Sequence, residues 1–105
     1  MSEEQAKYSV DGLKYDEGKP MPTLVHPAMV LGLARIFEYG LVKYERDSWQ
    51  KFTVEQAISC LPDAGLRHLY RWMEGERIDP ETGYHHLLHA AWNLLVMWWH
   101  DRGQK

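Results

Sequence analysis

The stretch YHHLLHAAWNLLVMWWHDR, residues 84–102, has the clearest helical pattern in the chain. Its apolar residues recur at three- and four-residue steps and extend around most of the cylinder: Leu87, Leu88, Ala91, Trp92, Leu94, Leu95, Val96, Trp98 and Trp99. The apolar part is shorter than the ~20 residues that span a bilayer, so we interpret it as a buried helix and expect no membrane association. A helix this apolar needs partners on more than one side, and we therefore expect a dimer or larger homo-oligomer.

Two further segments have helical periodicity. The first, about 27–44, begins with Pro27, which is tolerated in a first helical turn. The second begins with Thr53 and Gln56, which have the spacing of a capping box, and it ends shortly before Gly75. These segments and the apolar stretch predict an all-α fold, a small bundle of three main helices behind an ordered N-terminal arm.

Pro62 lies well inside the second predicted helix. Because proline lacks an amide hydrogen and its ring clashes with the preceding turn, we expect this helix to be kinked or split in two. The chain is long enough for one core, so we predict a tail at residues 1–11 and a single all-α domain at residues 12–105.

The composition limits the classes of function. With 105 residues, 45% of them hydrophobic and 26% charged, the chain has the proportions of one globular domain. Its formal net charge of -3 argues against binding of duplex nucleic acid, which needs a net basic face. Cys60 is the single cysteine, so an intramolecular disulfide and a thiolate zinc site are excluded. The first residues lack a basic region followed by an apolar one, and we expect a cytoplasmic protein.

His86, His89 and Asn93 form one polar stripe along the apolar helix. Buried imidazole and carboxamide groups persist only with hydrogen-bond partners or with a ligand. Both interpretations stay open at this point. Zinc is the weaker form of the ligand interpretation, because a His-x-x-His pair alone supplies two ligands.

Four carboxylates precede this helix closely: Glu74, Glu76, Asp79 and Glu81. Asp79, Pro80 and the residues after them have the form of a helix cap with a first-turn proline. Carboxylate oxygens also suit Mg²⁺ or Mn²⁺, which usually coordinate substrate phosphates as well. For the cluster as a whole we favour a metal site over a solvated helix end.

Basic residues that could converge on an anionic ligand lie in three stretches: Lys14 and Lys19, then Lys43 and Arg46, then Arg67, His68 and Arg71. Lysine and arginine both bind phosphates, although pairing at the surface is the plainer alternative. Trp49 lies outside any periodic apolar face. It is either a hydrophobic plug or a platform on which a base stacks.

Five blocks of residues occur in an order and spacing that is typical of one family. They are Lys14-Tyr15-Asp16-x-Gly18-Lys19-Pro20, Leu24-Val25-x-Pro27, Tyr39-Gly40-x-x-Lys43-Tyr44, Arg67-His68-Leu69-x-x-Trp72 and Gly75-Glu76-x-x-Asp79-Pro80-Glu81-Thr82-Gly83-x-x-His86-Leu87-x-His89-Ala90. Across roughly residues 12–97 the chain closely resembles the phage-associated family of dATP/dGTP diphosphohydrolase N-terminal domains.

The resemblance implies an all-α, MazG-like nucleotide pyrophosphatase, commonly oligomeric, that converts dATP or dGTP to the monophosphate and pyrophosphate with a divalent metal. It also implies a role in phage nucleotide metabolism, in the cytoplasm of the host cell. The acid pattern of MazG itself, Glu-Glu-x-x-Glu with Glu-x-x-Asp, is not visible on the predicted helices. The MazG metal cage therefore cannot be carried over to this chain.

The leading hypothesis is metal-dependent hydrolysis of a purine deoxynucleoside triphosphate between the α and β phosphates. We expect Glu76, Asp79 and Glu81 to hold Mg²⁺ or Mn²⁺, Lys14, Lys19, Lys43, Arg67 and Asn93 to bind the substrate, Trp49 to stack on the base, and His68, His86 and His89 to act in catalysis by orienting water or ligands. One alternative is a nucleotide-binding protein without turnover, such as a phage sponge that sequesters a host signalling nucleotide. The other is a helical interaction module.

Overall fold

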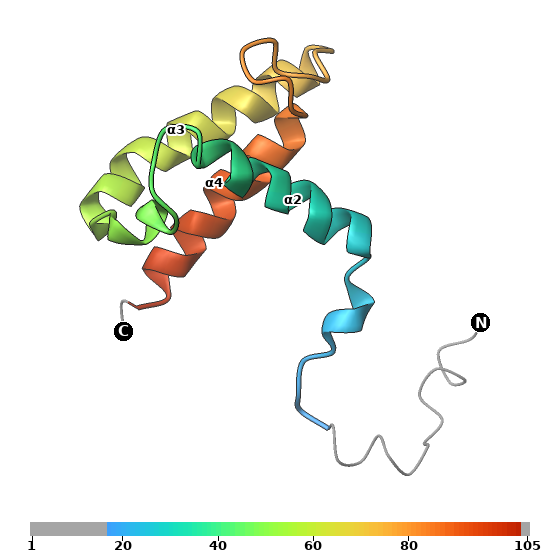
Figure 1. Cartoon of the computed structure of the whole chain (residues 1–105), viewed down its shortest axis with the longest axis vertical. Helices are drawn as coiled ribbons and strands as arrows, with labels where there is room; N and C mark the ends of the chain where they lie inside the picture. Colours follow the sequence, from blue (N-terminus) through green and yellow to red (C-terminus); the bar gives the residue numbers. More distant parts are fainter. Residues whose placement is uncertain (1–16, 104–105) are drawn as a thin grey trace, which may run out of the picture.

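The most apolar helix, α4 (His86–Asp101), lies at the centre of the fold because both other α-helices pack on it. A computed structural model describes residues 17–103, and this range contains three α-helices, two short 3₁₀-helices and no strand. The main partner of α4 is α3 (Val54–Met73), which runs antiparallel to it, while α2 (Pro27–Gly40) crosses over α4 (Figure 1). The predicted all-α bundle of three main helices is confirmed.

The segment that precedes α2, residues 17–26, is exposed throughout and includes the short 3₁₀-helix η2 (Pro22–Leu24). In Figure 1 this segment leads away from the three α-helices. The predicted tail at residues 1–11 lies outside the described residues. Within residues 17–103, every helix is too short or too polar to span a membrane.

Both ends of α3 follow from the sequence. The Thr53 side chain accepts a hydrogen bond from the Gln56 amide at 3.0 Å, and the Gln56 side chain accepts one from the Thr53 amide at 2.9 Å, so the predicted capping box is confirmed. At the other end Gly75 has φ +107°, a conformation that glycine adopts without steric cost. Its amide bonds to the Trp72 carbonyl, and the next amide bonds to the Arg71 carbonyl, which closes the helix.

Pro62 does not divide the second predicted helix, because α3 is assigned as one helix of 20 residues around it. The missing amide leaves the carbonyl of Ile58 without its partner four residues later. Ile58 is exposed, so water can satisfy that carbonyl. The split into two helices, one of the two outcomes that we expected, is therefore not observed.

The loop before α4 differs from the prediction. α4 begins at His86, and the Nδ1 of His85 accepts the Leu87 amide at 3.0 Å, so the predicted cap at Asp79 is wrong. Asp79 instead closes a turn inside the loop. The two sides of this loop are joined by backbone hydrogen bonds: the Asp79 amide donates to the Tyr84 carbonyl at 2.8 Å, and the His86 amide donates to the Arg77 carbonyl at 2.9 Å. This pairing fixes where Asp79 lies relative to α4.

The first helix is also shorter than we predicted, because α2 ends at Gly40 rather than Tyr44. Residues 41–44 continue as a turn in which the Tyr44 amide still bonds to the Gly40 carbonyl at 2.9 Å. From there the chain runs through the 3₁₀-helix η3 (Ser48–Lys51) to α3. This connection forms one wall of the candidate site.

The buried core lies between α3 and α4. Its buried residues are Ala57, Leu61 and Val96, and the half-buried side chains of Trp49, Phe52, Trp92 and Met97 pack against them. The two helices approach closely at Gly65, where an added Cβ would lie 3.2 Å from the Cβ of Asn93. A glycine at this point therefore sets the distance between the helices.

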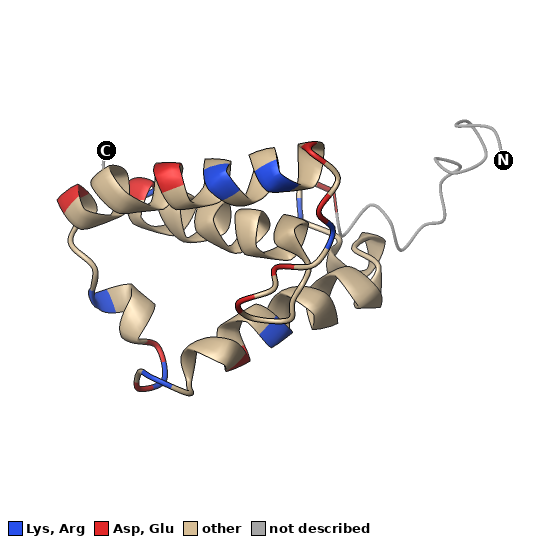
Figure 2. Cartoon of the chain, turned by 90° about the horizontal axis from the view of Figure 1, so that it is seen from above, with Lys and Arg blue, Asp and Glu red and all other residues tan. Residues whose placement is uncertain are grey.

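The outer side of α4 is apolar and exposed. Among Lys, Arg, Asp and Glu, α4 carries only Asp101, whereas charged residues are frequent on α3 and in the loops (Figure 2). Leu94, Leu95 and Trp98 are all exposed although they belong to the most apolar helix. The three described helices thus leave part of α4 without a partner, as the sequence pattern predicts.

Replacement of a core leucine tests this packing. We expect Leu61→Ala to lower the free energy of unfolding by about 2–5 kcal/mol, because it leaves a cavity in the buried cluster. Leu66→Ala is the matched control on the same helix, since Leu66 is 43% exposed, and its effect should stay near ~0.5 kcal/mol. Urea denaturation followed by circular dichroism measures both values. Equal losses in the two variants would contradict the assigned core.

Candidate functional site

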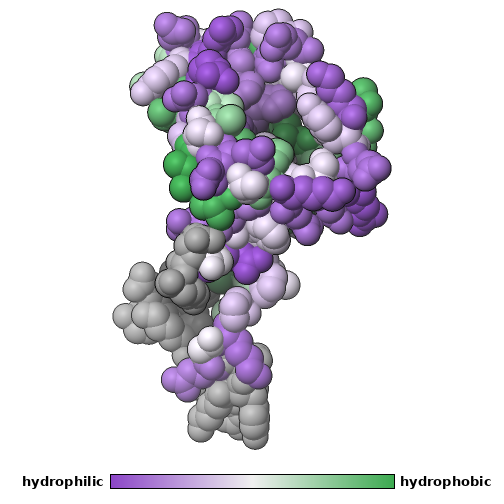
Figure 3. Space-filling model, turned by 90° about the vertical axis from the view of Figure 1, so that its left-hand side faces the viewer, coloured by the Kyte–Doolittle hydropathy of each residue, from purple (hydrophilic) through white to green (hydrophobic). Residues whose placement is uncertain are grey.

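A cleft of about 830 Å³ opens between α2, the connection at residues 41–52 and the α3–α4 pair. This volume is in the range of small-molecule sites. One part of its lining is aromatic: Phe37, Tyr39, Tyr44, Trp49, Phe52 and Trp92. A polar end contains His68, Asp79, Glu81, Thr82, His89 and Asn93, and the lining also includes Glu38, Glu45, Arg46, Asp47 and Ser48. In Figure 3 a hollow on one face of the molecule is surrounded largely by hydrophilic residues and has hydrophobic residues at its floor.

Two histidines meet next to the polar end of the cleft. The Nδ1 atoms of His68 on α3 and His86 on α4 lie 2.9 Å apart, and the Nε2 of His86 lies 2.7 Å from the Oε1 of Glu76. Because a carboxylate only accepts, His86 donates from Nε2 to Glu76 and offers the lone pair of its Nδ1 to the Nδ1–H of His68. His86 is 2% exposed, so these bonds satisfy a fully buried imidazole.

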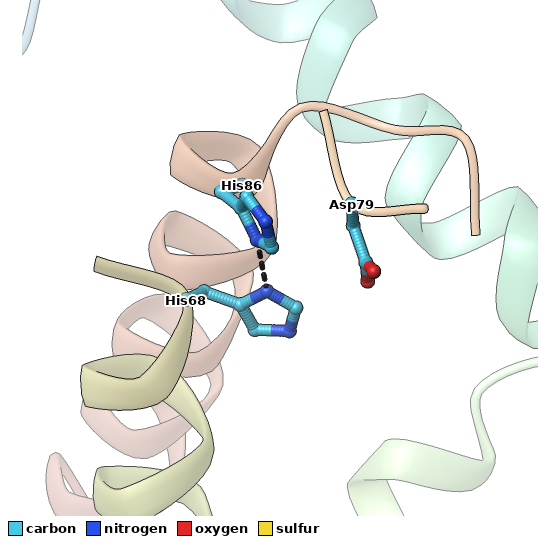
Figure 4. Close-up of side chains that lie close together, drawn as sticks. All are labelled: His68, Asp79 and His86. Carbon is cyan, nitrogen blue, oxygen red and sulfur yellow. Dashed lines mark hydrogen bonds between the residues drawn. The ribbon is translucent and has the colours of Figure 1, made fainter. Parts of the chain in front are cut away.

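Asp79 faces the same histidines from the loop (Figure 4). Its Oδ1 accepts the Glu81 amide at 2.9 Å, and its Oδ2 accepts the Thr82 hydroxyl at 3.3 Å. Burial raises the pKa of Asp79, but the Glu81 amide, the nearby His68 and the Thr82 hydroxyl outweigh it and hold the pKa below its usual value. Asp79 is therefore a buried carboxylate that keeps its negative charge.

His89 links this carboxylate to the histidine pair. Its ring stacks on that of His68, with the centroids 4.4 Å apart, and its Nε2 lies 2.7 Å from the Thr82 hydroxyl oxygen. Since the single hydroxyl hydrogen of Thr82 goes to Asp79, His89 donates to Thr82 from Nε2. The chain of hydrogen bonds runs from His89 through Thr82 to Asp79.

The pKa values of His68 and His89 are both lowered. Burial is the largest cause for each, and Asp79 opposes it. The neighbouring His86, together with Arg67 and Arg71, lowers the pKa of His68 further, and His68 and His86 lower that of His89. Both imidazoles are therefore neutral at neutral pH, the form in which a ring nitrogen offers a lone pair to a proton or a metal.

The structure brings together most of the polar stripe and part of the acidic cluster. His86, His89 and Asn93 are all buried, and the Nδ2 of Asn93 donates to the His89 carbonyl at 2.8 Å. Within the described residues, the group of side chains whose potential ligand atoms lie within 4.8 Å of one another is His68, Asp79 and His86. Glu76 is bonded to His86 instead, and Glu81 is an exposed residue that lines the cleft. A metal site made of Glu76, Asp79 and Glu81 stays a prediction.

Within residues 17–103, the predicted phosphate-binding cations are not gathered in the cleft. Lys14 lies outside the described residues, and Lys19, Lys43 and Arg67 are exposed and do not belong to the lining. Among the lysines and arginines of residues 17–103, the one that lines the cleft is Arg46. Phosphate contacts of the other cations stay a prediction.

Trp49 packs as a hydrophobic plug, one of the two roles that the sequence left open, while stacking on a base stays a prediction. Its ring packs edge-on against Phe37 and Trp99, with centroids 5.7 and 4.9 Å apart, and its carbonyl accepts a hydrogen bond from the Nε2 of His100. It also lines the cleft. The aromatic neighbours Phe37, Tyr39 and Trp92 and the hydroxyl of Thr82 were not predicted as site residues, because they lie on three segments, α2, α4 and the loop before α4, and periodicity does not show that these segments meet.

Comparison with known proteins adds a family and one relative. The sequence model of the family described as "dATP/dGTP diphosphohydrolase, N-terminal" matches residues 9–105. The chain is 35% identical over 88 residues to a protein of Salmonella phage PMBT28 named dATP/dGTP diphosphohydrolase. The aligned part covers 84% of this chain but 29% of that protein, so the chain spans less than a third of its relative. No solved structure matches the chain.

The lowered pKa values predict that the protein loses stability in mild acid. A histidine whose pKa is lower in the folded than in the unfolded state binds protons first in the unfolded chain, so stability falls as the pH drops below about 6.5. Asp79 adds a further loss below its unfolded pKa near 3.8. With a chelator present, we expect the Tm to decrease from about pH 7.5 to about pH 5 and to decrease less in His68→Gln. Calorimetric scans across this range would contradict the assignment if the two proteins had the same slope.

Proposed function

The chain belongs to the family of dATP/dGTP diphosphohydrolase N-terminal domains, and from this premise we propose that it hydrolyses purine deoxynucleoside triphosphates to the monophosphate and pyrophosphate. The main support is the composition of the cleft, which joins an aromatic wall to a polar end with buried histidines and a charged carboxylate. A nucleotide has the same division into a flat base and a charged phosphate chain.

The aromatic wall is suited to the base. Stacking on a tryptophan or tyrosine is sequence-tolerant because every base has a π-face. Trp49 and Tyr44 reach the wall from the 41–52 connection, and Phe37 and Tyr39 reach it from α2. Asn93 also lines the cleft, and no described residue donates a hydrogen bond to its Oδ1, so this atom is available to a substrate donor.

The polar end is suited to the reaction at the α phosphate. Water attacks the α phosphorus, the bond between this phosphorus and the oxygen that bridges the α and β phosphates breaks, and pyrophosphate leaves. A divalent cation would supply neutralisation of the phosphate charge and a more acidic bound water. The side chains present fit such a cation, since Asp79 is a buried, charged carboxylate and His68 is a neutral imidazole beside it. His86 contacts His68 through its Nδ1, and His89 stacks on His68 and is joined to Asp79 through the Thr82 hydroxyl.

We propose Mg²⁺ or Mn²⁺ as the cation. Oxygen ligands suit both ions, an imidazole ligand favours Mn²⁺ of the two, and Glu76 and Glu81 are the other carboxylates that could act on the ion, directly or through water. In a phage-infected cell the reaction would take place in the host cytoplasm. Because no solved structure matches, the MazG-like arrangement that the resemblance implies also stays a prediction.

A turnover assay tests the function. We expect the chain to release pyrophosphate and monophosphate from dATP or dGTP, and less from dCTP and dTTP, with Mg²⁺ or Mn²⁺ present. Asp79→Asn should lower the rate on the order of 10²-fold or more because it removes the charge at the polar end. Asp63→Asn is the matched control, since Asp63 is an exposed acid on α3 outside the cleft.

Chromatographic separation of the products decides the outcome. Release of orthophosphate alone, or unchanged turnover in Asp79→Asn, would contradict the proposed reaction. Nucleotide binding without turnover under either metal would favour the second candidate function, a protein that sequesters a nucleotide. The absence of the MazG acid pattern from the predicted helices is the observation that favours this second candidate.

We also propose that the chain self-associates through the exposed side of α4. A groove of about 390 Å³ between α3 and α4 is lined mainly by apolar residues, among them Ile58, Pro62, Leu94 and Trp98, with His100 and Asp101 at the same groove. Ile58 and Leu94 are exposed by 63% and 60%, although both belong to packed helices. Burial of such residues against a second copy is favourable by about 25 cal/mol per Å² of apolar surface.

Light scattering after size exclusion tests this association. We expect a dimer or larger species at micromolar concentration, and a shift towards the monomer in Leu94→Glu, because a buried carboxylate would oppose the contact. Val42→Glu is the matched control, since Val42 is an exposed residue of the loop that follows α2. A wild-type chain that elutes as a single monomeric species would contradict the association.

A further inference from the structure

Three side chains from separate segments converge at the polar end of the cleft. His68 belongs to the C-terminal half of α3, His86 opens α4, and Asp79 lies in the loop between these helices (Figure 4). Each offers a ligand atom, and these atoms all lie within 4.8 Å of one another. We propose that His68, Asp79 and His86 form a binding site for a divalent transition-metal ion, with two imidazole nitrogens and one carboxylate oxygen as ligands.

The spacing of the two imidazoles is suited to a metal ion. Their Nδ1 atoms lie 2.9 Å apart. Two nitrogens that bind one ion at ~2.1 Å and at a right angle are separated by about 3 Å, so both rings can turn to a shared ion with little movement. His68 then carries its proton on Nε2 rather than on Nδ1, and this change of tautomer releases no proton.

His86 is already held in the tautomer that a ligand needs. Its Nε2 donates to Glu76 at 2.7 Å, and this bond leaves the lone pair on Nδ1, on the side of His68. A carboxylate on the far nitrogen is the usual support of a metal-binding histidine, because it fixes the tautomer and raises the basicity of the ring. Glu76 is thus a positioning residue of the site.

Asp79 supplies the negative charge. Its side chain is 8% exposed, and within the described residues no lysine or arginine forms a salt bridge with it; its ion-pair neighbour is His89, at 3.8 Å. A buried carboxylate is costly without a compensating positive charge. The Glu81 amide and the Thr82 hydroxyl each use one lone pair of its two oxygens, which leaves others for a cation.

The donor set selects the class of ion. Mg²⁺ and Ca²⁺ prefer sites built from oxygen, whereas a site with imidazole ligands binds the first-row transition ions with an affinity that rises from Mn²⁺ to Cu²⁺ and remains high for Zn²⁺. His68 and Asp79 line the cleft, while His86 lies behind them. Three protein ligands leave coordination positions open towards the cleft, where water or a phosphate oxygen can enter.

Cobalt binding to the full chain tests the site. After removal of metals by a chelator, CoCl₂ should bind with one equivalent per chain and give visible ligand-field absorption. We expect ZnCl₂ to displace Co²⁺, and a large excess of MgCl₂ to leave it bound. In calorimetric titrations His68→Gln and His86→Gln should weaken binding at least about 100-fold, and Glu76→Gln about 10–100-fold.

His26→Asn is the matched control, because His26 is an exposed histidine that caps α2, and asparagine can keep this cap. It should bind Co²⁺ as the wild type does. If a variant at His86 fails to fold, X-ray absorption of the zinc-loaded wild-type chain replaces it and should show scattering from two imidazole rings. Equal Co²⁺ affinity in His68→Gln, displacement by Mg²⁺, or a zinc spectrum without imidazole would each overturn the proposal.

The metal site deepens the proposed hydrolysis, but its test contains no nucleotide. Co²⁺ binding without pyrophosphate release would leave the site intact and refute the hydrolysis. Turnover that needs no ion, or that persists at the wild-type rate in His68→Gln and His86→Gln, would support the hydrolysis but would show that the two histidines take no part in it. The two proposals can therefore fail separately.

Discussion

Buried imidazoles on an apolar helix must find polar partners, and this requirement determines how the helices and the loop meet. An unsatisfied buried donor or acceptor costs about 1–3 kcal/mol, a large share of the stability of a small domain. On α4 the partner of His86 is Glu76 with His68, and that of His89 is Thr82. Apolar contacts alone tolerate a helix that rotates or slides, whereas these bonds are directional. They therefore specify the register in which α3, α4 and the loop pack.

The same requirement acts at the other end of α4. His100 is buried, and its Nε2 donates to the carbonyl of Trp49, 51 residues earlier in the chain. The bond fastens the connection before α3 to the end of the last helix. Because Tyr44, Trp49 and Phe52 of that connection line the cleft, the bond also holds in place the aromatic side where the base is proposed to bind. Structural and ligand-binding roles are thus distributed along one helix.

The helices could be predicted because their signals are local. The Thr53–Gln56 capping box is complete within four residues, and the period of α4 marks which residues share a face. The composition of the site could be predicted only in part, because periodicity does not say what lies across from a face. His68 and His86 were both selected from the sequence, yet their contact joins positions 18 residues apart.

Asp79 shows a second limit. Its residue pattern fits a helix cap as well as a turn, and the backbone pairing of residues 78 and 85 decides between them. That pairing places Asp79, rather than Glu76 or Glu81, beside the ligand atoms of His68 and His86. No local sequence pattern indicates whether the predicted phosphate-binding cations lie in the cleft, since the positions of long charged side chains depend on solvent and on their neighbours rather than on periodicity.

Gly65 determines how closely α3 and α4 approach each other near the histidine pair. It lies one helical turn before His68, and it faces Asn93, which is two turns beyond His86, so closely that an added Cβ would lie 3.2 Å from the Asn93 Cβ. Asn93 can give way by the few tenths of an ångström needed only if α4 moves with it, because the Cβ that a new side chain would meet is attached to the backbone of α4. A single methyl group here would act as a wedge and would widen the gap that the two imidazoles bridge. Gly65 thus sets the separation of the two helices that carry His68 and His86, although it has no side chain that could take part in binding or catalysis.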